Sequence, residues 1–474
     1  MPTPALPSRL PHHHYSLLTI SFSLQIWFDG HSSLGSVPRL LPLVNSLLVQ
    51  VQAMVLLGTP CRQTVRLWQE RLGLYLLQLP PPRCTDWIWI IDHTLQWGTR
   101  RALVVLGVRQ TQLIHTGFCL THLDVQLLLV EVVTHSDGAM VQQQLQTLAD
   151  RVGVPRQIVS DHGSDLVKGI QLFRAARPEQ QSVIDTYDVT HKLACLLKAM
   201  LELDVRWQAF GRQCAQTGQE LRQTHGAFLH PPTPRPKARF MNVDVQVAWA
   251  ARILRLLQHG RRERLATVLG QPLATMEDWL NLKLGWLKGF AEDVATWSEL
   301  MWLTQQVRQQ VRQQGLARES AAQFRAQIRP LLSHGVPVQR LAAQVEAYLE
   351  NEGQAIPQGM NLVGSSEVIE SVFGRFKTYL ARSGWQEIGR NILLLPLLLC
   401  QWGMSTLAAA LQTVSGKAVT AWVEKELGPS QQTKYQQVLG RGMNKTEKEE
   451  RPPPTAAVAV EESSRSPPED RKVA

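Results

Sequence analysis

Two side chains of one predicted helix could act together on a phosphate group. Glu370 is followed seven positions later by Lys377, in the segment 365–377 that reads SSEVIESVFGRFK. At about 3.6 residues per turn, these two side chains share one face of a helix, while Phe373 belongs to a separate apolar face. Gly374 lies between them and leaves room for a phosphate. The pattern is that of a metal-binding carboxylate beside a phosphate-binding lysine, or of an amphipathic helix with a solvated charged face.

Two aspartates that follow predicted strands could supply further carboxylates to such a site. Asp92 comes directly after the β-branched and aromatic run Trp87–Ile91, and Asp161 follows the short apolar run Gln157–Ser160. Runs of this length and composition are typical of buried strands. Because ligands of open α/β sheets bind at the carboxyl ends of the strands, both aspartates are expected at a functional edge.

The elements around these aspartates predict the scaffold that positions them. Ser136 or Asp137 is a candidate N-cap for the helix that precedes the second aspartate. The order along the chain is three strands, helix, strand, helix, strand and helix, which is the order of the ribonuclease H-like fold. The expected elements are strands at 87–91, 101–108, 125–133, 157–160 and 182–188, and helices at 136–152, 166–176 and from His191 onward.

The neighbourhoods of the three carboxylates resemble those of a known family, the DDE transposases of bacterial insertion sequences. The stretches IDHTLQWGTRRALVVLGV, VSDHGSDL and SSEVIESVFGRFK are similar to the three catalytic neighbourhoods of that family, and the resemblance covers roughly residues 55–425. It implies that Asp92, Asp161 and Glu370 are the catalytic metal ligands. It also implies that Lys377 holds a phosphate near the scissile bond.

The activity that this resemblance implies is metal-dependent cleavage of DNA and strand transfer at the ends of a mobile element. Two Mg²⁺ or Mn²⁺ ions about 4 Å apart would activate the nucleophile and stabilise the leaving oxygen. Asp92 would bridge them, and Asp161 and Glu370 would complete the two sites. The implied partners are the terminal repeats, the target DNA and further copies of the chain in a homo-oligomer on paired ends. The implied location is the cytoplasm, in association with the nucleoid.

Two other functions remain open at this stage. A ribonuclease H-like nuclease would hydrolyse DNA without strand transfer, and a catalytically inactive relic would bind DNA without cutting it. The chain also departs from the family in two respects. The interval from Asp161 to Glu370 is 370 − 161 = 209 positions, against 161 − 92 = 69 between the aspartates, which predicts an inserted domain. The Tyr and Arg that some members carry before the Glu are here Val363 and Ser366.

Neighbouring acids and histidines compete for roles in the site. Glu367 could replace Glu370, but only Glu370 has the spacing to the lysine. Asp165 is expected to be a first-turn helix acid, which the helix dipole favours, and Asp188 is a candidate second-shell acid. His93 and His162 each follow a candidate ligand, and adjacent strand residues point to opposite faces, so shared ligation is not expected. The cysteines form no CxxC pair, which excludes the common zinc patterns.

Length and charge suit an enzyme that acts on nucleic acid. The chain has 474 residues, which suggests two to four domains, and its formal net charge of +10 favours polyanionic partners. Six scattered cysteines are typical of a reducing compartment. The apolar run Ile392–Met404 contains Pro396 and is too short to span a bilayer. The apolar stretch Ser16–Phe28 lacks a clear signal-peptide cleavage site.

The region before the first strand is a candidate for DNA recognition. Residues 1–36 are expected to be irregular and residues 37–80 helical, with one helix at 37–57 and a second that begins at Thr59-Pro60 and ends at Gly73. Arg62, Arg66 and Gln69 would face outward from the second helix, with both arginines as DNA-binding residues. The two helices form either a helix-turn-helix that reads terminal repeats or a plain helical pair that packs on the core.

The remaining boundaries follow from where strand signals disappear. The catalytic core is predicted at 83–200 and 361–425, interrupted by an α-helical insertion at 201–360. The loop His230–Arg239 is proline-rich and basic, so Arg235 and Lys237 either contact a DNA backbone or belong to an ordinary surface connection. Residues 440–474 are too poor in large apolar side chains to fold alone and are predicted to be disordered.

Overall fold

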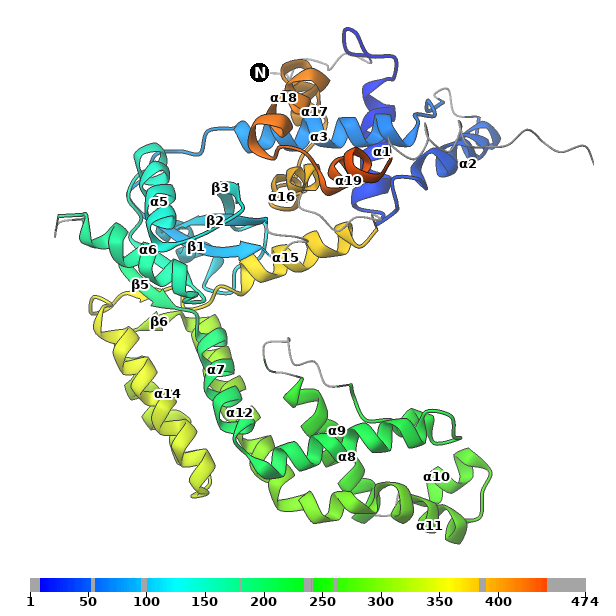
Figure 1. The fold of residues 1–474 in the computed structure, drawn as a ribbon, viewed down its shortest axis with the longest axis vertical. Helices are drawn as coiled ribbons and strands as arrows, with labels where there is room; N and C mark the ends of the chain where they lie inside the picture. Colours follow the sequence, from blue (N-terminus) through cyan, green and yellow to red (C-terminus); the bar gives the residue numbers. More distant parts are fainter. Residues whose placement is uncertain are drawn as a thin grey trace, which may run out of the picture.

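A five-stranded mixed sheet forms the centre of the molecule in the computed structural model (Figure 1). The structure describes residues 9–52, 56–94, 100–178, 181–233, 240, 242–258, 262–382 and 389–440. The strand order is β3-β2-β1-β4-β5, with β1, β2 and β3 antiparallel and β4 and β5 parallel to β1. This is the topology of the ribonuclease H-like fold, and it confirms the predicted fold class. The strands are β1 Trp87–Thr94, β2 Arg101–Arg109, β3 Gln126–Val133, β4 Gln157–Ser160 and β5 Ile184–Tyr187.

Alternation along β1 divides the sheet into two differently covered faces. Trp87, Trp89 and Ile91 belong to one core, which is covered by α5 (Gly138–Val152) and α6 (Ser164–Ala175). Ile88 and Ile90 belong to the other core, which includes α15 (Glu367–Leu380) and the N-terminal helices. Figure 1 shows α5 and α6 on one side of the sheet and α15 on the other. A strand buried on both faces has to be apolar throughout, as this one is.

Two local details refine the prediction for this core. Asp137, rather than Ser136, caps α5, because its carboxylate accepts a hydrogen bond from the backbone N–H of Met140 at 2.9 Å. A short helix that the sequence pattern did not predict, α4 (Gln110–Thr116), lies between β2 and β3. The loop that follows α4 returns the chain to β3 and forms one wall of a cavity described below.

The prediction of an irregular start is wrong for part of residues 1–36. Leu17–Phe28 forms helix α1, which is capped by Ser16 and buries Leu17, Ile20 and Leu24 against the main core. A stretch that is apolar all round becomes a helix when neighbours cover it. Helix α2 covers Val37–Gln50, so it ends earlier than the predicted residue 57.

Helix α3 (Arg62–Gln78) begins and ends later than its sequence pattern predicted. Its N-cap is Cys61, so the predicted cap at Thr59-Pro60 is wrong. Gly73 is not a C-cap. It lies inside α3, where a Cβ atom would collide with the backbone of Leu393. The glycine therefore allows α3 to lie close to η5 (Arg390–Leu394). The other helices that contact α3 are α1, α16 (Leu395–Leu398), α17 (Met404–Thr413) and α18 (Gly416–Glu426).

The long interval before α15 is a helical insertion with a hydrophobic core of its own, which confirms its predicted helical character. Figure 1 shows α7 and α12 leading away from the sheet and α8 to α11 at the far end. One correction is a two-stranded sheet of β6 (Leu316–Ala317) and β7 (Asn361–Leu362). The helices are α7 Val189–Glu202, α8 Val205–Leu221, η2 Ala227–Leu229, α9 Val243–Gln258, α10 Arg262–Leu269, α11 Leu273–Leu284, η3 Gly285–Phe290, α12 Ala291–Gln314, α13 Ser320–Gln327, η4 Arg329–Leu331 and α14 Val336–Gln354.

The C-terminal helices return to the N-terminal region. Buried leucines of η5 and α16 join the core beneath α3, which explains why the apolar run near Pro396 is buried without being a membrane segment. The chain continues through α19 (Gln431–Tyr435) and η6 (Gln436–Gly440). Within the described ranges, every helix is too short or too polar to cross a membrane. The predicted tail beyond residue 440 lies outside the described residues.

Candidate active site

Asp92 and Asp161 lie at adjacent positions near the carboxyl ends of β1 and β4. Strand β1 continues through Asp92 to Thr94, so Asp92 lies within the strand rather than after it, as the pattern had predicted. Ile91 of β1 and Ser160 of β4 are partners in a parallel pair, and each aspartate is the next residue along its chain. Asp92 is two residues after Ile90 on β1, so its side chain points to the same face of the sheet as Ile90, which faces the core that contains α15. Val159 of β4 faces that same core, and Asp161 is two positions further on. Both aspartates therefore belong to the α15 side of the sheet.

A tight turn fixes the Asp161 carboxylate. Its Oδ1 accepts a hydrogen bond from the backbone N–H of Gly163 at 2.9 Å. Between them His162 adopts a left-handed conformation with φ 57°, which is uncommon for a residue other than glycine. The His162 ring stacks on Tyr187 at 4.2 Å between centroids and lies 3.4 Å from a carboxylate oxygen of Asp185. These contacts hold the turn that directs Asp161.

One buried carboxylate brings the start of α15 to this edge. Asp188 is 0% exposed and caps α7, because it accepts from the backbone N–H of His191 at 2.9 Å. It also accepts from the N–H of Ser366 at 2.9 Å, and the N–H of Val189 donates to Gly364 at 3.0 Å. The insertion thus leaves the core and returns to it at a single point. Asp188 thus positions α15, whereas the role beside a metal ligand that the sequence suggested for it stays a prediction.

Helix α15 carries Glu370 and Lys377 from this point along the sheet. It contacts β1, and Figure 1 shows it running from the sheet towards α1 and α16. Glu370 is half-buried one turn after the helix begins, and Lys377 is exposed. A Cβ atom added to Gly374 would meet nothing within 4 Å, so the surface between the two side chains is open. The far end of the helix is held where the Tyr379 hydroxyl donates to the Phe28 carbonyl at 2.8 Å.

Glu367 is committed to structural contacts. Its carboxylate lies 3.1 Å from Arg308 and 3.0 Å from Arg312, and it accepts from the Thr190 hydroxyl at 2.8 Å. Both arginines come from α12 of the insertion, so this cluster joins the insertion to α15. Glu367 is therefore a poor candidate for a ligand, and the proposal for Glu370 rests on its spacing to Lys377. The sequence pattern did not identify the two arginines, whose only signal is their spacing of one helical turn.

His93 lies on the face of the sheet away from Asp92's side, as the alternation predicted. Its ring nitrogens are 3.3 Å from the Ser136 hydroxyl and 3.8 Å from Asp165. Burial lowers the pKa of the His93 imidazole, which the nearby Asp165 carboxylate opposes. Asp165 is in the first turn of α6, as predicted, and also lies 3.5 Å from Arg101. Neither side chain belongs to the candidate ligand set.

The predicted DNA-binding residues have different surroundings. Arg62 is exposed at the start of α3, and Arg66 is paired with Glu70 at 2.9 Å. Gln69 is buried, so the prediction that it faces outward is wrong, because other helices cover α3 on that side. Packing of α3 against several helices matches the helical-pair alternative. Arg235 and Lys237 lie outside the described residues.

Carboxylates are suitable ligands for a divalent cation, although these three do not form a complete set of metal ligands in this structure. In the part of the chain that the structure describes, no group of three His, Cys, Asp or Glu side chains is placed to hold a metal ion. Asp92 and Asp161 each follow one member of the paired residues Ile91 and Ser160, and carboxylate oxygens are the donors that Mg²⁺ and Mn²⁺ prefer. Glu370 is the third candidate on the same side of the sheet. The metal site stays a prediction.

Comparisons with known proteins give limited information. No protein-family model matches this chain, and no curated protein sequence matches it. Among solved structures, the chain is similar to the Drosophila P element transposase strand transfer complex. The sequence identity is 10%, the match covers 84% of this chain and 94% of that chain, and the TM-score is 0.38.

Proposed function

We propose that this protein is a DDE-type transposase that cleaves and joins DNA at the ends of a mobile element. One observation carries the proposal. Asp92 and Asp161, 69 positions apart, lie side by side at the carboxyl ends of neighbouring strands, and the helix that bears Glu370 lies on the same side of the sheet. Carboxylates from distant segments that meet at a sheet edge suit metal-dependent transfer of a phosphoryl group.

The roles of the residues follow from where they lie. Asp92 and Asp161, with Glu370, would hold one or two Mg²⁺ or Mn²⁺ ions. When bound, such ions lower the pKa of the attacking hydroxyl or water and stabilise the leaving oxygen. Lys377 is exposed on the Glu370 side of α15 and would bind a phosphate oxygen of the substrate strand. The open surface at Gly374 would let the DNA backbone reach both side chains.

The proposed partners are the terminal repeats of the element, the target DNA and further copies of the chain on paired ends. The net charge of +10 supports binding to a polyanion. The proposed location is the cytoplasm, in association with the nucleoid.

The decisive experiment measures cleavage and strand transfer of labelled element-end DNA with Mg²⁺ or Mn²⁺. Wild type is compared with Asp92→Asn, Asp161→Asn and Glu370→Gln, each of which removes one anionic ligand with little change of shape. Asp165→Asn is the matched control, because that carboxylate is four positions from Asp161 and is paired with His93 and Arg101. We expect the three ligand variants to lose at least about a thousandfold in rate while DNA binding persists.

Each outcome of this experiment has a separate meaning. Metal-dependent joining by the wild type and the control variant, together with its loss in the three ligand variants, would support the transposase. Nicking without joining to a free 3′-hydroxyl would identify a nuclease. Binding without any cleavage by the wild type would identify an inactive relic. Full activity in any one of the three ligand variants would remove that residue from the site.

A further inference from the structure

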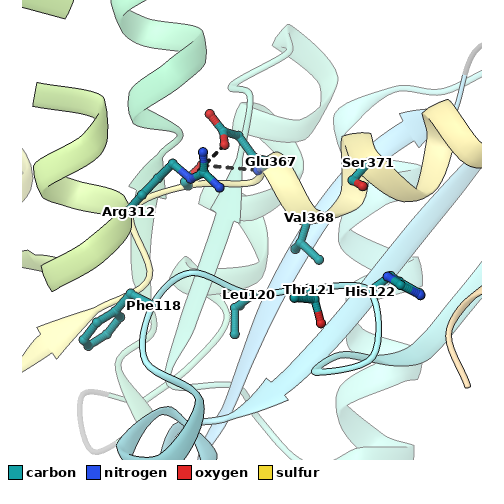
Figure 2. Close-up of a pocket in the computed structure, with 9 residues that line it drawn as sticks. Phe118, Leu120, Thr121, His122, Arg312, Glu367, Val368 and Ser371 are labelled. Atoms are coloured by element: carbon teal, nitrogen blue, oxygen red, sulfur yellow. Dashed lines mark hydrogen bonds and ion pairs between the residues drawn. The ribbon is translucent and has the colours of Figure 1, made fainter. Parts of the chain in front are cut away.

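A cavity of about 330 Å³ lies beside the first two turns of α15, where three distant parts of the chain meet. One wall is the loop between α4 and β3, with Phe118, Leu120 and His122. The opposite wall comes from α15 and from Arg312 of α12. Figure 2 shows the loop side chains along one side, and Glu367, Val368 and Ser371 on the other. None of the residues in the proposed catalytic set lines this cavity.

Helix geometry separates the cavity from the candidate catalytic side chains. At 100° per residue, Val368, Ser371 and Arg375 lie on one flank of α15. Glu370 and Lys377 lie on another flank, about 140° away around the helix axis. Val368 and Ser371 therefore line the cavity on the flank away from Glu370, while Glu367, which also lines it, is about 60° from Glu370 around the helix axis. A DNA strand that reached both Ser371 and Glu370 would have to cross α15.

The surroundings of the cavity have a small excess of positive charge. Both oxygens of Glu367 are taken by arginines, Oε1 by Arg308 and Oε2 by Arg312, so this cluster carries two cations for one anion. Arg312 also donates to the Cys119 sulfur at 3.5 Å, which ties it to the loop wall. Asp124, the nearby loop acid, accepts from the backbone N–H of Thr121 at 2.7 Å and from its hydroxyl. Asp124 keeps its negative charge, so the guanidinium groups of Arg308, Arg312 and Arg375 outweigh the carboxylates of Glu367 and Asp124 by one charge, 3 − 2 = +1.

The opposite end of the cavity adds an imidazole. His122 lines the cavity, and the Arg375 guanidinium lies near it without lining the cavity. Burial lowers the pKa of His122, and the Arg375 guanidinium lowers it further, so the imidazole is a hydrogen-bonding group there rather than a fixed positive charge. The hydroxyls of Ser365 and Ser371 supply hydrogen-bond donors between the two ends. Guanidinium groups and hydroxyls around a small cavity are the usual protein ligands of phosphate oxygens.

We infer that this cavity is a second phosphate subsite, which binds a backbone phosphodiester of the DNA on the flank of α15 away from Glu370. The choice of DNA as the source of the phosphate ester rests on the proposed function. Arg312 holds the phosphate at the insertion side, and Ser371 and His122 contact it along α15. The insertion thereby contributes a cation to DNA binding beside the catalytic helix.

A matched pair of arginine variants tests this subsite. Arg308→Gln and Arg312→Gln each remove one arginine from Glu367, but only Arg312 lines the cavity. DNA binding is measured by fluorescence anisotropy at several salt concentrations, in an Asp161→Asn background that prevents cleavage. Loss of one phosphate contact should lower the slope of log K against log salt by about 0.9 and the affinity by about tenfold. We expect this change in Arg312→Gln and at most a twofold change in Arg308→Gln. Equal losses in the two variants would overturn the subsite.

A second pair tests the cavity without touching the arginine cluster. Ser371→Asp places a carboxylate in the cavity, and Thr378→Asp places the same charge on an exposed position of the same helix outside it. We expect Ser371→Asp to weaken DNA binding at least about fivefold more than Thr378→Asp. Similar effects of the two carboxylates would count against the cavity and in favour of general repulsion.

Alkylation of Cys119 identifies the source of the phosphate. Cys119 is exposed and contacts Arg312, so an occupied cavity should protect it from iodoacetamide. We expect protection by duplex or single-stranded DNA and little protection by inorganic phosphate or a nucleoside monophosphate at the same phosphate concentration. Protection by the small anions alone would overturn the DNA assignment. If the arginine pair differs as expected but the wild type cuts no DNA, the proposed function fails while the subsite stands.

Discussion

Neutralising Glu367 should loosen the attachment of α15 without abolishing chemistry. The carboxylate receives Arg308, Arg312 and the Thr190 hydroxyl at 3.1, 3.0 and 2.8 Å. Its side chain is 23% exposed and the two arginines are 35% and 36% exposed, so each ion pair is partly screened and is worth about 0.5–1 kcal/mol. Glu367→Gln keeps the side-chain shape and an acceptor for Thr190. The expected loss is therefore about 1–2 kcal/mol.

Native-state hydrogen exchange measures this loss where it occurs. The amides of Val189 and Ser366, which donate to Gly364 and to Asp188, report the opening of the junction between α7 and α15. A loss of 1–2 kcal/mol corresponds to exchange about 5- to 30-fold faster at these two amides. Amides in β1 and β2 are the internal reference and should change by less than about twofold.

The same variant separates Glu367 from Glu370 as a ligand. If α15 is only loosened, Glu367→Gln should retain at least about a tenth of the wild-type cleavage rate, whereas Glu370→Gln should retain none that is measurable. Unchanged exchange at Val189 and Ser366 in Glu367→Gln would refute the idea that the contacts of Glu367 hold α15 in place. A complete loss of cleavage in Glu367→Gln, with exchange unchanged, would make Glu367 the ligand and refute the assignment of Glu370.

Three further outcomes follow from single positions. Gly374→Leu should stabilise α15 by about 0.5–1 kcal/mol, because the space is open and leucine is the better helix former; thermal unfolding measures this effect. The same variant should slow DNA cleavage in the cleavage assay, because the leucine side chain covers the approach to Glu370 and Lys377. Burial raises the pKa of Glu352 above its ordinary 4.5, so the folded state binds the proton more tightly than the unfolded state. The stability from this group is full below pH 4.5 and is lost as pH rises through the folded pKa, which lowers the melting temperature over that range. Glu352→Gln should make the melting temperature depend less on pH there, and an unaltered pH profile would contradict this reasoning. Burial raises the pKa of the Cys214 thiol to about 12, so a thiol reagent at pH 8 should label Cys61, Cys119 and Cys195 in the native protein and Cys214 only after unfolding, as peptide mapping would show.

The sheet and the positions of the two aspartates could be predicted from sequence because both depend on local patterns. Continuous apolar strands such as Trp87–Ile91 are distinctive, and an acid at the end of each strand is visible in the chain itself. The spacing of Glu370 and Lys377 correctly predicted one helix, which the structure places at Glu367–Leu380. These features need no knowledge of distant partners.

The errors occurred where a distant partner decides the structure. Helix α1 forms because other helices cover its apolar surface, and Gly73 remains inside α3 because Leu393 lies against it. Glycine at that position reads as a helix end when the neighbouring backbone is unknown. The contacts of Glu367 with α12 were invisible for the same reason, since arginines on an amphipathic helix give no sign of which acid they meet. The sequence alone therefore did not show that Glu367 is held by arginines of α12.

The return of α15 to the sheet has a consequence for the protein's synthesis. The proposed site needs Asp92 and Glu370, which are 370 − 92 = 278 positions apart. At about 5–20 residues per second, a ribosome needs about 14 to 56 seconds to make the intervening chain. During that time Ile88 and Ile90 lack the helix that covers their face of the sheet. The nascent protein therefore passes through a long interval in which it is both inactive and prone to aggregate, and in which chaperones can bind the uncovered strand.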